Sequence, residues 1–486
     1  MSLSRLSSLR LFRQQCHVGG TWVDAEDGST IAVDNPASGE VFGRIPSLTA
    51  AQVEAAIDTA QSAFIDWRAR TAQQRADLLL RWHDLVLANR EDIAILMTLE
   101  QGKPLVEAQG EVDYAASFLR WFAEEARRVY GETIPGAKPG QQIVVLRQPV
   151  GVTAAITPWN FPAAMITRKA GAALAAGCSM IVKPAEATPY TALALAVLAE
   201  EAGLPPGVFN VITGEARLIG QVLTASPVVR KLSFTGSTAV GRQLMAQCAE
   251  HIQKVSLELG GNAPFIVFDD ADLDRAVEGA MASKFRNTGQ TCVCANRFLV
   301  QRSVHEAFVD KLAAAMAKLR LGNGFEPGVT QAPLINQAAV RKVQQHYRDA
   351  LDKGARHVSG AVPDGAQGNF VEPVLISEVN PGMQLCHEET FGPLAAVMPF
   401  DTEQQAIELA NATPYGLAAY FYSRDVHRCW RVAEALEAGI VGVNEGAISN
   451  PAAPFGGVKA SGLGREGSRH GLEEYTELKY LCMGAG

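Results

Sequence analysis

The chain has 486 residues, of which 48% are apolar and 19% are charged, and its formal net charge is −8. This composition is that of a globular protein with two or three domains, and the negative charge argues against a nucleic-acid partner or an anionic membrane surface. The eight cysteines form no Cys-x-x-Cys pair and the nine histidines no His-x-x-x-His pair, so we expect neither a disulfide framework nor a metal site.

The N-terminal part is predicted to hold short strands followed by helices. The first ten residues contain Arg and Ser without an acid, but they are too few for a transit peptide, so we expect a cytoplasmic protein. Residues 20–47 are typical of short strands and turns, and the 3.6-residue spacing of apolar side chains then predicts helices, including 50–64, 75–88 and 112–128. The longest charge-free run, 148–167, contains three prolines and is therefore not a membrane span.

From residue 151 onward the pattern becomes a regular alternation of strands and helices. Strands are expected at 152–156, 179–183, 208–212, 229–234 and 254–259, with helices at 163–175, 188–202, 215–224 and 238–249. Such repeated units predict an α/β fold with a doubly wound parallel sheet. A second α/β block follows from about 263 to 455. The strand candidates 143–147 and 477–482 suggest a small arm that pairs with another subunit.

Polar residues follow four of these strands, at the end of the sheet where ligands bind in an open parallel arrangement. They fall at 157–162, 183–186, 234–238 and 258–262. Any one of these segments is also compatible with an ordinary turn. Their shared position is what predicts a ligand-binding edge.

Two of the four segments suit a nucleotide. Gly236 and Ser237 precede a helix whose free N–H groups and dipole would favour a phosphate, although a helix N-cap without a ligand has the same pattern. Lys183 and Glu186 could hydrogen-bond a ribose diol, or they could form a surface ion pair.

The other two segments offer a base and an amide. Glu258 ends a strand before two glycines, so its carboxylate could act as a general base in an apolar setting, or it could be an exposed edge charge. Asn160 lies between two prolines and could donate to an oxyanion, or it could simply form the turn.

Cys292 follows a Gly-containing turn and is a candidate nucleophile, although free cysteines are more often packed as small apolar residues. Cys294 is two positions further, and in an extended segment both side chains would share a face. Their Cα atoms would then be about 6–7 Å apart, at the edge of disulfide geometry. We hypothesise a reversible oxidative lock between them.

Together these segments resemble the aldehyde dehydrogenase superfamily over nearly the whole chain. The similarity is carried by 158–162, 183–186, 234–238, 257–261, 289–292, 388–393 and 454–457. Within the superfamily, 285–297 and 443–449 are most similar to succinate-semialdehyde dehydrogenases. The resemblance implies that Cys292 attacks the aldehyde to give a thiohemiacetal, whose oxyanion Asn160 and the Cys292 N–H would hold. Hydride transfer to nicotinamide would leave a thioester, and Glu258 would activate water.

The resemblance also implies the residues that bind a nicotinamide dinucleotide. They are Trp159, Lys183, Glu186, Gly236, Ser237, Leu259, Glu389 and Phe391. An acid at 186 would repel a 2′-phosphate, so NAD is expected, while Lys183 partly offsets this repulsion and leaves NADP possible. No metal is implied.

For the substrate, the resemblance points to Arg168, Arg286 and Ser449 as ligands of a distal carboxylate, which guanidinium groups chelate well. One of the two arginines could instead make a structural ion pair. The expected activity is NAD-dependent oxidation of succinate semialdehyde to succinate. The alternatives are glutarate semialdehyde or another aldehyde, a CoA-acylating enzyme, against which Glu258 argues, and a non-catalytic protein on the same scaffold.

The expected division of the chain has three parts. A Rossmann-like NAD-binding domain comprises 1–128 and 148–257, and a second α/β catalytic domain comprises 258–460. A small β oligomerisation arm comprises 129–147 and 461–486, from which we expect a homodimer or homotetramer.

Overall fold

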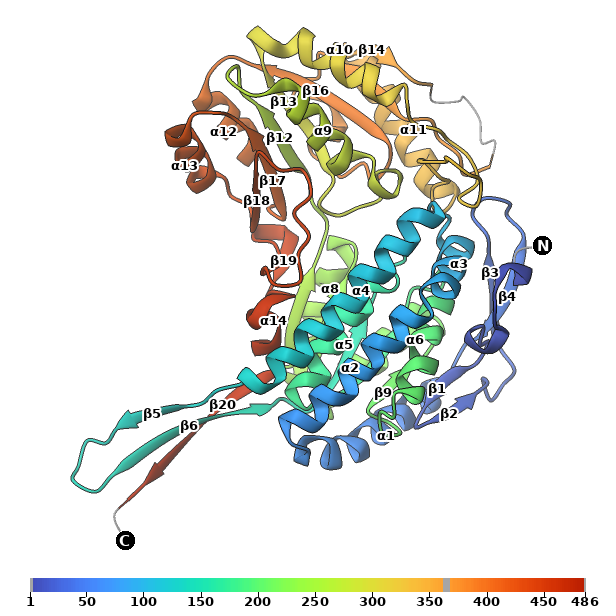
Figure 1. Ribbon diagram of the computed structural model, residues 1–486, viewed down its shortest axis with the longest axis vertical. Helices are drawn as coiled ribbons and strands as arrows, with labels where there is room; N and C mark the ends of the chain where they lie inside the picture. The colour runs from blue at the N-terminus through green and yellow to red at the C-terminus, as the bar shows by residue number, and fades with distance from the viewer. Residues whose placement is uncertain (1–2, 362–367, 485–486) are drawn as a thin grey trace.

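Two large sheets and a small protruding one make up the molecule (Figure 1). The computed structural model describes residues 3–361 and 368–484. Both large sheets are mostly parallel and the small one is antiparallel, so the predicted α/β class is confirmed. None of the described helices is long and apolar enough to cross a membrane.

The first large sheet has eight strands, ordered β19-β11-β10-β7-β8-β9-β1-β2. The five central strands are parallel, as predicted, and antiparallel strands extend both edges. The strands are β1 (Cys16–Val18), β2 (Thr21–Val23), β7 (Val152–Ile156), β8 (Ser179–Lys183), β9 (Phe209–Val211), β10 (Val229–Thr235), β11 (Lys254–Glu258) and β19 (Gly462–Leu463).

Helices cover both faces of this sheet because its central strands are buried on both sides. Neighbouring strand residues alternate between two cores: Ala154 packs with α1, α7 and α8, whereas Ala155 packs with α2 to α6. The helices are α1 (Ala50–Ala69), α2 (Ala72–Ala88), α3 (Arg90–Gln101), α4 (Leu105–Glu125), α5 (Ala164–Ala176), α6 (Tyr190–Glu201), α7 (Ala216–Ala225) and α8 (Thr238–Cys248).

The second large sheet has seven strands, ordered β14-β15-β16-β13-β12-β17-β18, and only β14 is antiparallel. Its strands are β12 (Ala263–Val267), β13 (Ala295–Gln301), β14 (Arg356–Ser359), β15 (Val374–Ser377), β16 (Leu394–Phe400), β17 (Ala418–Tyr422) and β18 (Ile440–Val443). Its helices are α9 (Leu273–Lys284), α10 (His305–Met316), α11 (Gln337–Asp352), α12 (Glu403–Asn411) and α13 (Val426–Ala435). The chain passes from the first sheet to the second through residues 259–262.

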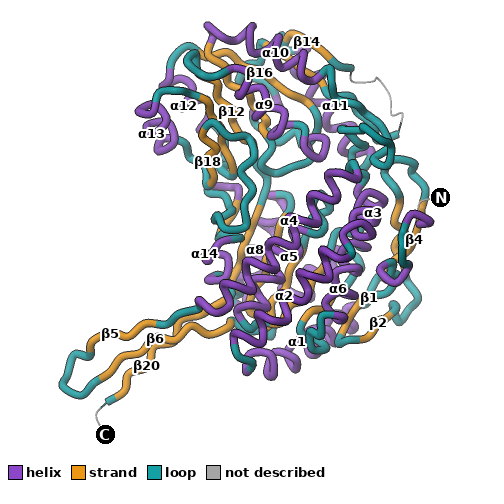
Figure 2. The backbone as a smooth tube through the Cα atoms, viewed as in Figure 1, coloured by secondary structure: helices purple, strands orange, loops and turns teal. Residues whose placement is uncertain are grey.

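The third sheet forms the arm that projects from the body (Figures 1 and 2). Its strands β5 (Glu132–Pro135), β6 (Gln142–Pro149) and β20 (Thr476–Met483) are antiparallel, and β20 pairs with β6 along its whole length. The predicted arm segment 461–486 is therefore divided in the structure. Its strand β19 pairs with β11 in the first large sheet, and its helix α14 (Ser468–Glu473) packs against α4 and α5.

A separate hairpin near the N-terminus is formed by β3 (Thr30–Asp34) and β4 (Val41–Pro46). The predicted short strands within 20–47 are thus present. Two short 3-10 turns precede them, at Leu3–Arg5 and Leu9–Leu11.

Candidate active site

The loop that carries Cys292 has an unusual backbone. Asn287 and Thr288 adopt φ values of 52° and 54°, in the left-handed region that side chains disfavour. Gly289 follows with φ of 77°, and a Cβ atom there would lie 2.3 Å from the Gly392 carbonyl oxygen. The close approach of these two segments therefore requires glycine at position 289.

The cysteine loop is a turn and not the extended segment that we expected. The Cys294 N–H donates to the Thr291 carbonyl oxygen at 3.0 Å, which closes a turn over 291–294. The Cys294 side chain is buried, with its Sγ 3.1 Å from the Lys284 carbonyl oxygen, whereas Cys292 lines a cavity. The premise that both side chains share a strand face is therefore wrong, and the oxidative lock stays an untested hypothesis.

Glu258 is a buried carboxylate at the end of β11, with only 2% of its surface exposed. Neither of its oxygens has a hydrogen-bond partner in the described part of the chain. Burial raises the pKa of Glu258 well above its usual range, and the nearby Glu466 carboxylate adds to the rise, while Arg168 and Lys169 oppose it. The alternative of an exposed edge charge is thus excluded.

Burial acts on Cys292 in the same direction. It raises the pKa of the thiol to about 12, and the Arg168 guanidinium opposes the rise by favouring the thiolate. Burial therefore disfavours the ionised form of both candidate reacting groups.

Asn160 is 5% exposed and lies against the cysteine loop. Its Nδ2 donates to the Gln290 carbonyl oxygen at 3.0 Å, and its Oδ1 has no partner among the described residues. Because a carbonyl only accepts, the Asn160 amide must direct an N–H toward it. Asn160 and Cys292 line the same cavity.

This first cavity, of about 360 Å³, is bounded by both large sheets. It contains Cys292, Glu258 and Asn160 together with six of the eight predicted cofactor residues, namely Trp159, Gly236, Ser237, Leu259, Glu389 and Phe391. Trp159 and Phe391 meet edge to face, with ring centroids 5.6 Å apart. Burial raises the pKa of Glu389 to about 7.

The residues around this cavity fit a dinucleotide. Ser237 lines the cavity and caps α8 by accepting the Val240 N–H, so the N-terminus of α8 lies at the cavity, where the helix dipole favours an anion. Lys183, the last residue of β8, is buried and forms an ion pair with Glu186, whose side chain is about a third exposed (35%). Lys183 and Glu186 were predicted either to bind a ribose or to form an ion pair, and the ion pair is observed.

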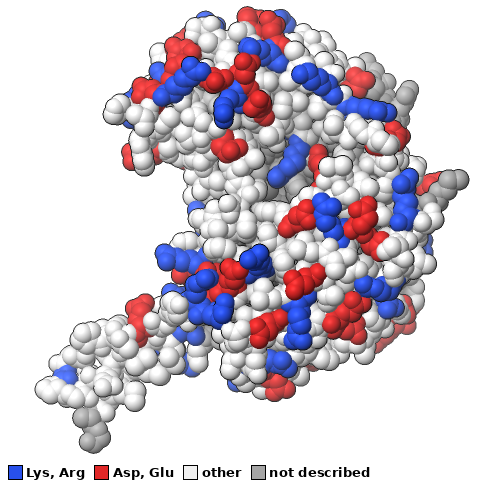
Figure 3. All heavy atoms as spheres, in the orientation of Figure 1, with Lys and Arg blue, Asp and Glu red and all other residues white. Residues whose placement is uncertain are grey.

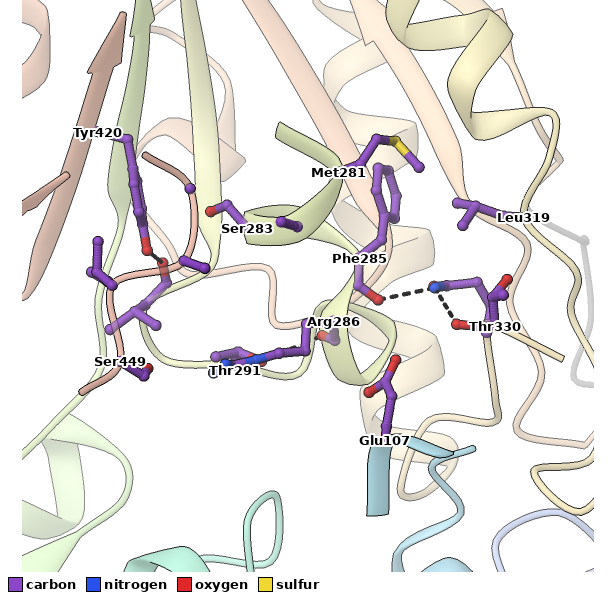
Figure 4. Close-up of a pocket in the computed structure, with 16 residues that line it drawn as sticks. Glu107, Met281, Ser283, Phe285, Arg286, Thr291, Leu319, Thr330, Tyr420 and Ser449 are labelled. Atoms are coloured by element: carbon purple, nitrogen blue, oxygen red, sulfur yellow. Dashed lines mark hydrogen bonds between the residues drawn. The ribbon is translucent and has the colours of Figure 1, made fainter. Parts of the chain in front are cut away.

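A second cavity, of about 380 Å³, is lined by other residues of the cysteine loop (Figure 4). Thr291 and Val293 line it, so the peptide that carries Cys292 separates the two cavities. Arg286 and Ser449, two of the predicted substrate ligands, also line it, and in Figure 4 Arg286 lies between Ser449 and Glu107. This cavity thus combines a cation with a hydroxyl beside the nucleophile.

Arg168, the third predicted substrate ligand, does not line either cavity. Its guanidinium is buried, 2.5 Å from the Glu466 carboxylate and 4.3 Å from the Phe455 ring centroid. The arrangement is that of a structural ion pair, the alternative that the sequence left open. The direct contact of Arg168 with a substrate remains a prediction.

The sequence of the chain matches one protein family along most of its length. A sequence model described as "Aldehyde dehydrogenase family" matches residues 22–481. The chain belongs to the aldehyde dehydrogenase family.

Named aldehyde dehydrogenases of known activity are similar over almost the whole chain. A glutarate-semialdehyde dehydrogenase of Pseudomonas aeruginosa is 62% identical over 99% of both chains. The NADP(+) succinate-semialdehyde dehydrogenase of Escherichia coli is 59% identical over 99% of this chain and all of its own. The crystal structure of an aldehyde dehydrogenase from Brucella melitensis biovar abortus 2308 matches with a TM-score of 0.98 at 60% identity, covering 99% of both chains. The protein is thus an NAD(P)-dependent aldehyde dehydrogenase similar to succinate- and glutarate-semialdehyde dehydrogenases.

Sequence reasoning missed three charged residues of this aldehyde dehydrogenase site. Glu466 and Lys169 form a buried ion pair beside Glu258, and Glu107 lines the second cavity near Arg286. Local sequence does not distinguish Glu466 and Glu107, because their partners are distant in sequence. Lys169 left one local signal, since it and Arg168 are the two charged residues of helix α5.

Proposed function

We propose that this aldehyde dehydrogenase oxidises succinate semialdehyde to succinate, with NAD as the preferred cofactor. The observation that carries the proposal is the second cavity, in which Arg286 and Ser449 lie beside the loop of Cys292. A guanidinium and a hydroxyl suit a carboxylate, and the cysteine loop brings the other end of a short semialdehyde to the sulfur.

In the first half of the reaction, Cys292 is the nucleophile and its thiolate adds to the aldehyde carbon. The positive charge of Arg168 favours the thiolate against the effect of burial. The second N–H of the Asn160 amide and the Cys292 backbone N–H stabilise the oxyanion of the thiohemiacetal. A nicotinamide dinucleotide, when bound, supplies the hydride acceptor that converts this adduct to a thioester.

In the second half, Glu258 is the base that takes a proton from the water attacking the thioester. Its raised pKa makes the ionised form a stronger base than an exposed carboxylate. The carboxylic acid product then leaves and Cys292 is restored. The position of Glu258 in the cavity of Cys292 supports water, and not the thiol of CoA, as the acceptor.

The dinucleotide would be held by the first cavity, with its pyrophosphate at Ser237 and its adenosine ribose at Lys183 and Glu186. Glu389 would contact the nicotinamide ribose and Phe391 the ring. The Glu186 carboxylate disfavours a 2′-phosphate, which supports NAD over NADP. The ion pair with Lys183 partly neutralises it, so NADP retains some activity.

Glutarate semialdehyde is the second candidate substrate, since its dehydrogenase in Pseudomonas aeruginosa is 62% identical to this chain. One methylene in a pocket changes specificity by only about 10- to 200-fold. The length of the second cavity therefore decides between the two substrates.

The test is the initial rate of NADH formation with succinate semialdehyde, glutarate semialdehyde and acetaldehyde, with NADP as a control. We expect kcat/KM to be highest for succinate semialdehyde with NAD. Arg286→Leu should raise the KM for both semialdehydes about 10-fold or more, because a charge-assisted contact is lost, and leave acetaldehyde nearly unchanged. A preference for glutarate semialdehyde would overturn the choice of substrate, and an equal effect on acetaldehyde would overturn the role of Arg286.

We further propose a cytoplasmic homodimer or homotetramer. All eight cysteines are free, which suits a reducing compartment. The arm exposes apolar side chains that a second subunit could cover. They are Ile134, Leu146, Leu478, Tyr480 and Met483.

A further inference from the structure

A buried ion pair lies behind Asn160, outside both cavities. Lys103, in the connection between α3 and α4, is 1% exposed and forms an ion pair with Glu111 of α4, which is 4% exposed. Burying two charges costs several kcal/mol each, and apolar residues of similar volume are often at least as stable. Stability alone therefore does not account for charges at this position.

Both members of this pair also contact one short turn, at 160–164. The Lys103 Nζ donates to the Asn160 carbonyl oxygen at 2.8 Å. At the other end of the turn, the Glu111 Oε1 accepts the N–H groups of Ala163 and Ala164, at 2.9 and 3.3 Å. The ion pair therefore holds the turn at both ends, just before α5 begins.

A chain of amides links the same turn to the cysteine loop. Gln101 accepts the Lys103 N–H through Oε1 and donates through Nε2 to the Asn287 Oδ1, both at 3.0 Å. The Asn287 Nδ2 donates in turn to the Asn160 carbonyl oxygen at 3.0 Å and to the Gln290 carbonyl oxygen at 3.3 Å. The strained backbone at Asn287 is thus one anchor of the network.

The side chain of Asn160 has one anchor of its own, the Gln290 carbonyl oxygen. One N–H of its amide is used there, so the other remains for an oxyanion, while the Oδ1 is held by no described residue. The position of that free N–H relative to Cys292 therefore depends on where the backbone of Asn160 is fixed. The carbonyl of Asn160 accepts two hydrogen bonds, one from the Asn287 amide and one from the Lys103 ammonium group, which is the charged donor.

We propose that the Lys103–Glu111 ion pair positions the oxyanion donor: it fixes the turn of Asn160 against the cysteine loop, so that the Asn160 amide meets the developing charge. The inference rests on the role of Asn160 proposed above. Lys103 and Glu111 are positioning residues, because neither lines the cavities that would hold the reactants. A misplacement of about 1 Å in such a group costs about 10²-fold in rate.

The experiment measures the single-turnover rate of NADH formation at saturating NAD and succinate semialdehyde. Lys103→Met and Glu111→Gln should each lower this rate about 10- to 100-fold, while the KM of the semialdehyde stays within about threefold. Lys103→Arg, which keeps a charged donor, should recover most of the rate. If Lys103→Met does not fold, the near-isosteric Glu111→Gln variant decides, with thermal unfolding as the check on its fold.

Glu100→Gln is the matched control. Glu100 is a buried carboxylate of α3 that accepts the N–H groups of Tyr190 and Thr191 at the start of α6, just as Glu111 does at the start of α5. Among the described residues, no hydrogen bond or ion pair joins it to Lys103 or Asn160, and its one link to the pair is charge repulsion with Glu111. We expect Glu100→Gln to keep the wild-type single-turnover rate, whatever it does to stability. An equal loss in Glu100→Gln and Glu111→Gln would overturn the inference, because general loosening would then explain both.

Asn160→Ala separates this inference from the proposed function. Loss of an oxyanion donor should slow the single turnover about 10²- to 10³-fold. If Asn160→Ala is slow while Lys103→Met and Glu111→Gln both react at the wild-type rate, the positioning role fails and the role of Asn160 stands. If Asn160→Ala itself reacts at the wild-type rate, the role of Asn160 fails and the positioning role with it.

Discussion

Burial raises the pKa of both the Cys292 thiol and the Glu258 carboxyl, so both favour the protonated form. The two shifts have opposite consequences for reactivity. A raised pKa lowers the amount of thiolate at neutral pH, whereas it makes the carboxylate, once formed, a better base. The Arg168 cation opposes both rises, whereas Lys169 and Glu466 act on the pKa of Glu258 and Glu389 acts on that of Cys292.

Alkylation of Cys292 in the ligand-free protein should therefore follow a raised pKa. The thiolate fraction rises about tenfold per pH unit below the pKa, so the iodoacetamide rate should still be rising at pH 10. In the urea-unfolded protein the same residue should level off near pH 9. Rates measured by peptide mapping from pH 7 to 10 test this, and a plateau below pH 8 in the folded protein would contradict it.

Glu258→Gln should separate the two halves of the reaction. One equivalent of NADH per site should form at nearly the wild-type rate, because the acylation residues are intact. The steady-state rate should then fall about 10²- to 10⁴-fold, the usual contribution of a general base. Rapid-mixing absorbance and the intact mass of the acyl-enzyme provide the measurement. Equal losses in the burst and the steady state would instead place Glu258 in acylation.

At the scale of single residues, the sequence indicated the reacting side chains but not the buried ion pairs that surround them. Asn160 and Glu258 lie at the ends of predicted parallel strands, so the convergence of these two was foreseeable, whereas the place of Cys292 beside them was implied only by the resemblance to the family. The ion pairs of Lys103 with Glu111 and of Arg168 with Glu466 were not foreseeable, because each depends on how helices pack. Local sequence carries no record of such a pairing.

At the scale of elements, the first two helices begin at strong local signals. Thr71 caps α2 and Thr49 caps α1, each in a capping box with the glutamine three residues later. Two of the five predicted central strands match the observed bounds and the other three differ by one residue at one or both ends, because short buried apolar runs end at polar residues. The two-residue strand β19 and the turn at 291–294 were not predicted, since both depend on contacts with distant segments.

Thr71→Ala should lower the free energy of unfolding by about 1 kcal/mol, the usual value of an N-cap hydrogen bond. Thr71 lines neither cavity, so kcat should not change. Thr49→Ala is the matched variant, and the two effects should add within about 0.5 kcal/mol. Urea unfolding followed by circular dichroism gives both values; a loss of kcat without a loss of stability would contradict this view of α2.

At the scale of the whole molecule, the arm is the part least explained by a single chain. Its outer part is almost free of charged side chains (Figure 3), and Leu478 and Tyr480 are each 61% exposed. A three-stranded sheet that exposes apolar side chains to water is only marginally stable by itself. A subunit interface would bury these side chains.

Leu478→Lys combined with Tyr480→Lys should therefore reduce the size of the particle in analytical ultracentrifugation, with the helical signal retained. Val41→Lys is the control, because Val41 is similarly exposed, at 55%, in the hairpin on the opposite side of the body (Figure 1). It should leave the sedimentation coefficient unchanged. An unchanged particle for the double variant would mean that the arm does not hold subunits together.

The peptide around Cys292 lies between two cavities. If the coenzyme occupies one cavity, as proposed, the aldehyde would enter through the other and the acid would leave the same way. The acid would then be released while the dinucleotide is still bound.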